Sequence, residues 1–258
     1  MIRELFERQR PLMIAGTVSL VLGVITLLLS LIDPTQILGI SRWIKPMKFF
    51  FSIAMFVWTI AVLLDQLKGE ERFGKFVSWV LIVVFVGEML GIVGQPLRGT
   101  TSHFNVKTAF DGGVYAMMGV LIVISSLMVA AVTYKYFRVK TELPRAVLWS
   151  VRIGLLIFLA GSIEGGYMSA QLGHTVGAAD GGPGLPLTNW STTAGDLRVA
   201  HFLGLHAIQV MPLIGLILER SRVAGRTAIV FAAATIYFIF FAAVLVQALN
   251  GRPLFVIG

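Results

Sequence analysis

Residues 227–251, TAIVFAAATIYFIFFAAVLVQALNG, contain no Asp, Glu, Lys or Arg, and residues 112–134, GGVYAMMGVLIVISSLMVAAVTY, share this property. A helix needs about 20 mainly apolar residues to cross the hydrocarbon core of a bilayer. Of the whole chain, 57% is hydrophobic and 13% is charged. Soluble globular chains are roughly half apolar and a quarter charged. The pattern therefore predicts an integral membrane protein built from α-helices.

Five further apolar segments can be traced between turn-forming residues, which makes seven expected transmembrane helices. We expect them at residues 12–32, 47–67, 76–95, 112–134, 147–172, 199–218 and 227–249. The first segment is longer than the apolar region of a signal peptide, so we interpret it as a retained helix. No stretch between the helices is long enough to fold separately, and residues 1–258 are predicted to form one membrane domain. The absence of cysteine excludes disulfides and thiolate metal sites.

The distribution of Lys and Arg predicts the orientation of the helices. Fourteen of these residues fall in the N-terminal segment and the second, fourth and sixth connectors, with Arg152 counted at the edge of the fifth helix, and seven fall on the other side. Because cytoplasmic loops carry the excess of positive charge, the N-terminus is expected in the cytoplasm and the C-terminus in the periplasm. The net charge of +8 is divided among short connectors. Anionic lipid headgroups explain it better than nucleic acid does.

Two acidic residues lie inside the predicted helices, and charges in such positions usually mark a cavity or a partner. Glu88 is followed by Gly91 and Gly94, and Glu164 is followed by Gly165 and Gly166. Small residues allow close approach of helices, so the two glutamates could face each other across a tight interface. Either residue is a candidate for acid–base catalysis or ion binding. The alternative is a structural role as an ion pair or a hydrogen-bonded carboxyl.

The two glutamates share a further pattern. Gln95 follows Glu88 by seven residues, and Gln171 follows Glu164 by the same interval. Seven residues make two helical turns, so each pair is expected on one helix face. The pattern is either a chance outcome of the composition or the trace of a parallel internal repeat, an arrangement found in some transporters.

Polar residues near the outer ends of the second and fourth helices are candidate binding residues. Lys48 could neutralise Glu88, Glu164 or Asp111, or its ammonium group could extend to the headgroups. Asp111 begins the fourth helix, with Tyr115 on the same face. Capping of the helix by Asp111 is the simpler interpretation unless it meets Lys48.

All four histidines fall in the outer half of the expected topology: His103, His174, His201 and His206. The sixth helix gathers the densest polar set, because Asp196 and Arg198 precede it and Gln209 lies within it. A metal site would combine His201 and His206 with His174 and Glu164, since a spacing of five residues suits no metal by itself. A haem held by His206 and Met168 is a second possibility. Packing histidines are the alternative to both.

The last third of the chain carries three distinctive motifs, GHTVG at residues 173–177, DGGPGLP at residues 180–186 and DLRVAHFLGLHAIQ at residues 196–209. These motifs resemble a family of bacterial polytopic membrane proteins without an assigned activity. The resemblance implies a location in the bacterial inner membrane and brings no substrate with it.

We therefore expect a polar pocket open to the periplasm, whose rim includes Lys48 and Asp111. Its walls would hold the candidate catalytic residues Glu88, Glu164, His201 and His206, and the loop of residues 173–198 would cover it. The leading hypothesis is a membrane-embedded enzyme or a metal or haem protein acting on a small molecule or ion. The alternatives are a proton- or ion-coupled transporter using the two glutamates, and a sensor or assembly factor without catalysis.

Overall fold

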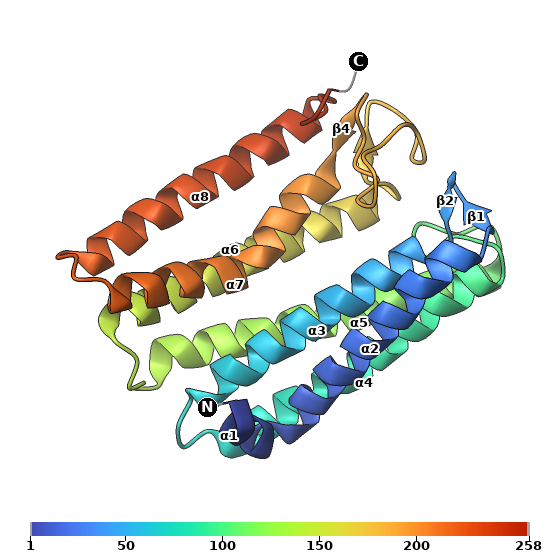
Figure 1. The fold of residues 1–258 in the computed structure, drawn as a ribbon. Helices are drawn as coiled ribbons and strands as arrows, with labels where there is room; N and C mark the ends of the chain where they lie inside the picture. Colours follow the sequence, from blue (N-terminus) through green and yellow to red (C-terminus); the bar gives the residue numbers. More distant parts are fainter. Residues whose placement is uncertain (1, 257–258) are drawn as a thin grey trace. The chain divides into compact units, whose positions relative to one another are not determined.

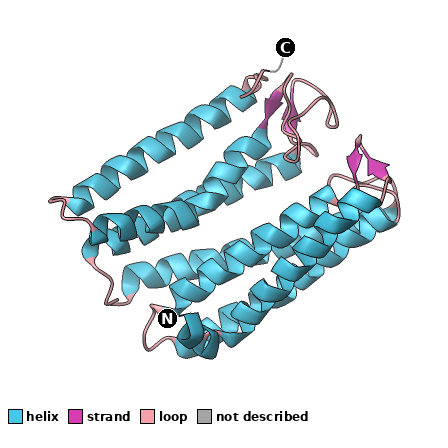
Figure 2. Ribbon diagram, viewed as in Figure 1, coloured by secondary structure: helices cyan, strands magenta, loops and turns pink. Residues whose placement is uncertain are grey.

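A computed structural model describes residues 2–256 of the chain, and within them nearly all regular structure is helical (Figure 2). Seven helices are long and apolar enough to cross a membrane, which confirms the predicted all-α polytopic architecture. They are α2 (Arg10–Ile32), α3 (Ile44–Asp65), α4 (Glu71–Leu97), α5 (Ala109–Arg138), α6 (Arg145–Ala170), α7 (Leu197–Arg220) and α8 (Arg226–Leu249). A short helix, α1 (Ile2–Arg8), precedes them.

The helix ends differ from the predicted limits by a few residues, because polar residues can extend a helix beyond the hydrocarbon region. At its start α4 includes Glu71, and at its end it includes Pro96, which we had placed in a connector. By contrast, α6 ends two residues before the predicted limit. Leu172 adopts a left-handed conformation with φ of 54°, and the amide of Gly173 donates to the carbonyl of Met168 over 3.2 Å. This bond closes the helix with a Schellman motif.

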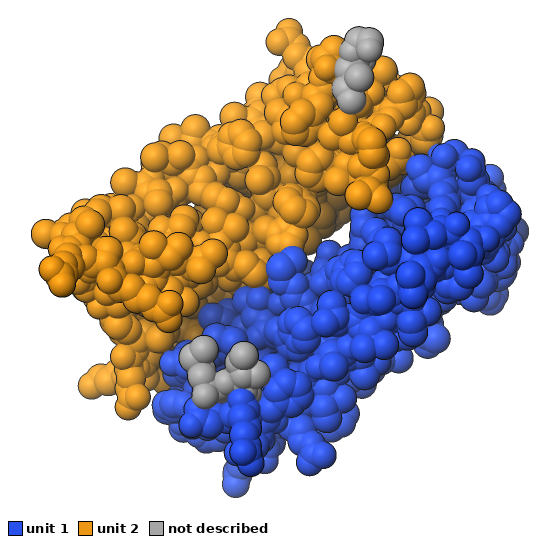
Figure 3. All heavy atoms as spheres, viewed as in Figure 1, with its two compact units in different colours: residues 1–132 blue, residues 133–258 orange. Residues whose placement is uncertain are grey.

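The helices pack as two compact units, residues 1–132 and residues 133–258, which Figure 3 distinguishes by colour. The first unit holds α1 to α4 and most of α5, and the second holds the end of α5 and α6 to α8 (Figure 1). The expectation of a single domain stays a prediction.

Packing in the first unit depends on glycines that receive aromatic rings. Gly16 and Gly23 of α2 lie against the rings of Trp58 and Phe51 of α3, and a Cβ atom at either glycine would come within 3 Å of its ring. The indole of Trp58 also donates to the carbonyl of Met13 over 3.2 Å. These contacts hold α2 and α3 as an antiparallel pair.

A small hairpin, formed by β1 (Gln36–Ile37) and β2 (Ile40–Ser41), connects the end of α2 to the start of α3. Its turn uses Leu38 and Gly39, which both have positive φ angles, as a two-residue hairpin turn requires. Asp33 accepts hydrogen bonds of 2.7 Å from Arg42 and from the indole of Trp43, and 3.0 Å from the amide of Thr35. The bonds from Thr35, Trp43 and Arg42 hold the pKa of Asp33 well below its usual range.

In the second unit α6 and α7 meet backbone to backbone. A Cβ atom on Gly161 would lie 2.8 Å from the Cα atom of Gly204, and one on Gly154 would lie 2.6 Å from the carbonyl oxygen of Ala207. Such small-residue contacts are the usual basis of tight helix pairing in membranes. The third helix, α8, is linked through the hydroxyl of Tyr237, which donates to the carbonyl of Leu203 over 2.6 Å.

The surfaces of the long helices carry large apolar side chains. Val83 of α4, Ile163 of α6 and Ile236 of α8 expose between 65% and 77% of their area. In water this would be unfavourable, whereas lipid tails provide an apolar surrounding for them. The helices are therefore suited to contact with a bilayer.

Candidate functional site

Glu88 lies on the buried face of α4. Its side chain is 2% exposed, and neither carboxyl oxygen has a hydrogen-bond partner among the described residues. Lys45, at the start of α3, interacts with it electrostatically. Gln95 lies two turns further along the same face and is equally buried, as the seven-residue spacing predicted. A buried carboxyl without hydrogen bonds is costly and usually has a functional reason in a membrane protein.

Glu164 occupies a comparable depth in α6 and is 5% exposed, but it has a histidine beside it. Oε2 of Glu164 lies 3.0 Å from Nδ1 of His201, which projects from α7. The ring can reach this position because residue 165 is glycine, where a Cβ atom would lie 2.6 Å from Cε1 of His201. The small residues that bring α6 and α7 together therefore also place the acid and the base in contact.

Nδ1 of His201 has a second neighbour, the carbonyl oxygen of Gly161 at 2.9 Å. The direction of a ring N–H fits this carbonyl, and neither oxygen of Glu164 receives a hydrogen bond of good geometry from the described part of the chain. One ring nitrogen carries at most one proton, so Nδ1 cannot serve both oxygens fully. In the structure Nδ1 is hydrogen-bonded to the carbonyl of Gly161, while Oε2 of Glu164 lies at nearly the same distance without a hydrogen bond.

Other residues of the sixth predicted helix lie apart from this pair. His206 packs its ring against Phe202 at 4.2 Å between centroids and forms a side-chain hydrogen bond with Gln209. His174 lies in the loop after α6 and contacts Asp180. Within residues 2–256 no group of three or more His, Asp or Glu side chains is close enough to hold a metal ion. The proposed metal ligands His174, His201, His206 and Glu164 are thus not gathered, apart from the Glu164–His201 contact.

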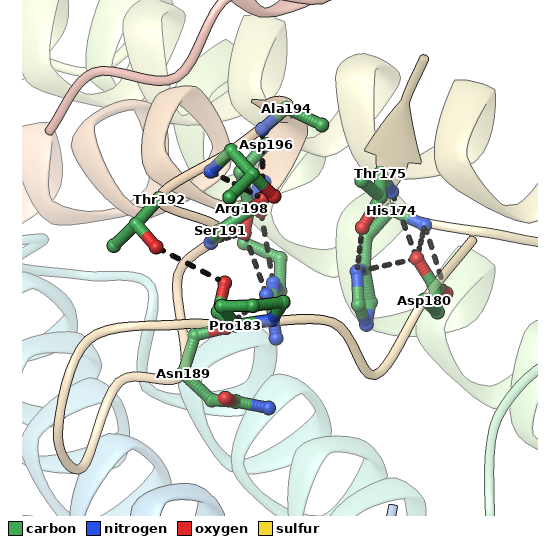
Figure 4. Close-up of polar contacts among 11 residues, drawn as sticks. His174, Thr175, Asp180, Pro183, Asn189, Ser191, Thr192, Ala194, Asp196 and Arg198 are labelled. Atoms are coloured by element: carbon green, nitrogen blue, oxygen red, sulfur yellow. Dashed lines mark hydrogen bonds and ion pairs between the residues drawn. The ribbon is translucent and has the colours of Figure 1, made fainter. Parts of the chain in front are cut away.

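The loop between α6 and α7 is organised around two aspartates (Figure 4). Asp196 accepts from the amide of Ser191 over 2.7 Å and from the guanidinium of Arg198 over 2.6 and 2.9 Å, and its side chain is 1% exposed. It also accepts from the amide of Arg198 over 3.0 Å, which caps α7. The same guanidinium donates to the carbonyl of Asn189. The binding residues predicted at 196 and 198 therefore hold the loop on the first turn of α7.

The second aspartate, Asp180, binds the beginning of the loop. Its carboxylate accepts from the amide of Thr175 over 2.9 Å and lies 2.9 Å from Nδ1 of His174. Burial raises the pKa of Asp180, but the bonds from His174 and Thr175 outweigh this effect and hold the pKa well below its usual range. A two-stranded ladder, β3 (Thr175–Val176) with β4 (Gly195–Asp196), joins this part of the loop to the capping aspartate. Hydrogen bonds to the two aspartates thus hold the loop at its beginning and at its end.

Asp111 organises the corresponding connector of the first unit. Its carboxylate accepts from Thr108 and Arg98 over 2.7 Å and from Gln95 over 2.9 Å, while its own amide donates to the Thr108 hydroxyl over 3.1 Å. Thr108 and Asp111 are therefore bonded to each other at the start of α5 through the Asp111 amide and through the two side chains. Arg98 is thus a cation bonded to Asp111.

The remaining candidates of the first unit belong to an aromatic group. The ring of His103 lies 5.8 Å from that of Phe49, 6.1 Å from that of Phe104 and 6.4 Å from that of Tyr115. Lys48 lies in the first turns of α3 and is half-buried. These residues make the end of the first unit around the start of α3 packed and partly polar.

Sequence reasoning missed two of the residues on which these clusters depend. The Thr108-x-x-Asp111 spacing is a recognisable capping signal and could have indicated Thr108. The spacing of Asp180, six residues after His174, carries no such signal, because the contact depends on the path of an irregular loop.

Comparisons of the chain with protein-family models, with curated proteins and with solved structures found no match. The resemblance to a bacterial membrane-protein family therefore stays a prediction. Seven apolar helices and a lipid-suited surface identify the chain as a polytopic membrane protein.

Proposed function

We propose that the protein is a proton- or cation-coupled transporter of the bacterial inner membrane, with the Glu164–His201 pair as the site where the coupling ion binds. The observation that carries this proposal is the position of Nδ1 of His201, 2.9 Å from one oxygen acceptor and 3.0 Å from another. A proton arriving at or leaving the pair changes which acceptor the ring serves. The competing acceptor, the carbonyl of Gly161, lies at the point where α6 and α7 touch.

This position links ion binding to helix packing. At Gly161 the two helices have no side chains between them, so a shift of the His201 ring acts directly on their contact. Packed helix interfaces respond to small local changes by moving between discrete arrangements. Glu88, buried without a hydrogen bond in the first unit, would be a second binding group for the coupling ion.

The test uses the full-length protein in liposomes adsorbed on a solid-supported membrane, with currents recorded after a pH jump. Metal cations, organic anions, amino acids and organic cations are added class by class. We expect one class to evoke a current with the wild-type protein that Glu164→Gln abolishes and His201→Gln reduces at least tenfold. Glu142→Gln, at an exposed position between α5 and α6, is the matched control and should leave the current unchanged.

The proposal fails if no class evokes a current above that of Glu164→Gln liposomes. A readout independent of solute is the infrared difference spectrum between two pH values. A carboxyl band that disappears in Glu164→Gln but not in Glu142→Gln is expected. Its absence would show that Glu164 does not exchange a proton.

A membrane-embedded acid–base enzyme is the second candidate, because the ordered loop of residues 173–196 is joined to α7, which carries His201. Glu164 and His201 would then act as general acid and base on a substrate from the periplasmic side. Chemical conversion of an added solute, lost in Glu164→Gln without any solute-dependent current, would favour this candidate over transport.

A further inference from the structure

The opposite end of the second unit carries a separate feature, a basic pocket between the starts of α6 and α8 and the end of α7. Its volume is about 560 Å³. Small-molecule sites are roughly 300 to 1,000 Å³ in size, so the pocket is large enough for a phosphate headgroup. It is lined by Pro144, Arg145, Ala146, Glu219, Arg222, Val223, Ala224, Gly225, Arg226, Thr227 and Ala228.

The lining has a net positive charge even after the ion pair between Arg226 and Glu219 is taken into account. Arg226 is fully engaged, since it donates to Glu219 over 2.9 Å, to the carbonyl of Ser221 over 2.9 Å and to that of Val223 over 3.2 Å. This pairing neutralises the one acidic residue of the lining. Arg145 and Arg222 are exposed, and neither has an ion-pair or hydrogen-bond partner within residues 2–256. Two guanidinium groups are therefore available to an anion.

Backbone donors face the same space. Helices α6 and α8 begin at Arg145 and Arg226, and neither N-terminus has a side-chain cap. Residues of both first turns line the pocket, among them Ala146 and Thr227. The first amides of a helix lack partners within the helix and favour negative charge. They add to the attraction that the two arginines already provide.

The neighbouring surface indicates that the anion comes from a lipid. One turn inward from Arg145 and Thr227 lie Trp149 and Phe231, whose ring centroids are 5.2 Å apart. Tryptophan is enriched at the level of the headgroups. Val223, in the lining itself, is 48% exposed and offers an apolar edge. The lining of the pocket thus combines arginine side chains with apolar residues.

We infer that this pocket binds a phosphate group, supplied by the headgroup of an anionic phospholipid. The diester phosphate accepts from Arg145 and Arg222, and its acyl chains follow the apolar edge that Val223 offers. Basic pockets at the cytoplasmic ends of transmembrane helices are suited to such headgroups. The proposal concerns the end of the unit away from the Glu164–His201 pair and does not depend on the proposed transport function.

Native mass spectrometry of the full-length protein in detergent tests the inference, with phosphatidylglycerol and phosphatidylcholine as ligands. The wild-type protein should bind phosphatidylglycerol more tightly than phosphatidylcholine. Each of Arg145→Gln and Arg222→Gln should weaken this binding about fivefold, and the double variant about 25-fold, because each removes a guanidinium that donates to the phosphate and one hydrogen bond contributes about that factor. Arg220→Gln removes the same charge at an exposed residue outside the lining and is the matched control.

Inorganic phosphate forms the second arm and identifies the source of the anion. Competition by millimolar phosphate against phosphatidylglycerol in the wild-type protein supports a shared site. Binding of phosphate alone, without phosphatidylglycerol and lost in the double variant, would overturn the lipid source. Equal phosphatidylglycerol binding by the wild-type protein and the double variant, or an equal loss in Arg220→Gln, would overturn the pocket itself.

Discussion

Each unit buries a glutamate at a similar position along a helix, but the neighbours of the two glutamates differ. In each, a helix carries a buried glutamate towards its end, a loop follows, and an aspartate bonded to an arginine stands at the start of the next helix. Five residues after that aspartate, the second unit has His201, whereas the first has Ala116. Glu164 therefore has a histidine beside it on the helix that follows, whereas the charged neighbour of Glu88 is Lys45 at the start of α3. A common arrangement can thus hold a carboxyl beside a titratable ring or one beside a lysine.

The helix contacts beside the glutamates differ as well. Gly161 faces the backbone of Gly204, whereas Gly91 in the first unit faces the flexible end of the Met118 side chain, with Sδ 2.5 Å from the position of a Cβ atom. A methionine tip can move aside, but a backbone cannot. The helix contact beside Glu164 is therefore more sensitive to added volume than the one beside Glu88.

Gly161→Ala should have the largest effect, lowering the free energy of unfolding by about 2 to 3 kcal/mol, within the range for overpacked sites. Gly91→Ala should lower it by less than about 1 kcal/mol because Met118 can adopt another rotamer. Reversible unfolding in mixed micelles measures both. Gly166→Ala is the control on α6, since nothing lies within 4 Å of its Cβ position. Equal losses at Gly161 and Gly166 would contradict the backbone contact.

Replacing the two glutamates should reveal a smaller difference between the units in the free energy of unfolding. Glu88→Met removes a buried carboxyl without hydrogen bonds and should raise the free energy of unfolding by about 1 to 2 kcal/mol. Glu164→Met takes away the acidic neighbour of His201 and should yield no such gain. The same micelle titration compares the two variants. A gain of equal size for both would show that His201 does not stabilise its neighbour.

Acid should weaken the loop of the second unit in a way that depends on Asp180. Because its pKa in the folded protein is lowered, Asp180 stabilises the loop above its ordinary pKa of about 3.9, and this contribution is lost as pH falls towards the folded value. The side chain is partly exposed, so less than about 1 kcal/mol is expected. Hydrogen exchange of the His174 and Thr175 amides, corrected for intrinsic rates, measures it. In Asp180→Asn these amides should exchange faster at neutral pH and lose the acid-dependent change.

Much of the fold could be predicted because apolar runs and charged connectors directly reflect the bilayer. All seven long helices follow from these runs, and only their ends were displaced. The left-handed turn at Leu172 could not be predicted, since leucine rarely adopts that conformation and the position gives no glycine signal.

The candidate site could be predicted in its composition but not in its pairing. The sequence indicated Glu164 and His201 as candidate residues of one pocket, yet their contact depends on the rotation of two helices about their axes. That rotation is set by glycines whose partners lie about 40 residues away in the chain. The two glutamines of the seven-residue pattern also lie in different surroundings. Gln95 is buried two turns beyond Glu88, whereas Gln171 follows the end of α6 and is exposed.

Asp196 links the loop of residues 173–196 to α7. Its carboxylate accepts from the amide of Ser191 in the loop and from the amide of Arg198 in the helix, so a displacement of the loop would also move the start of α7. His201 lies five residues further on, about 7.5 Å along the helix axis. A molecule that binds the loop and displaces it would therefore shift the first turns of α7 and, with them, the His201 ring.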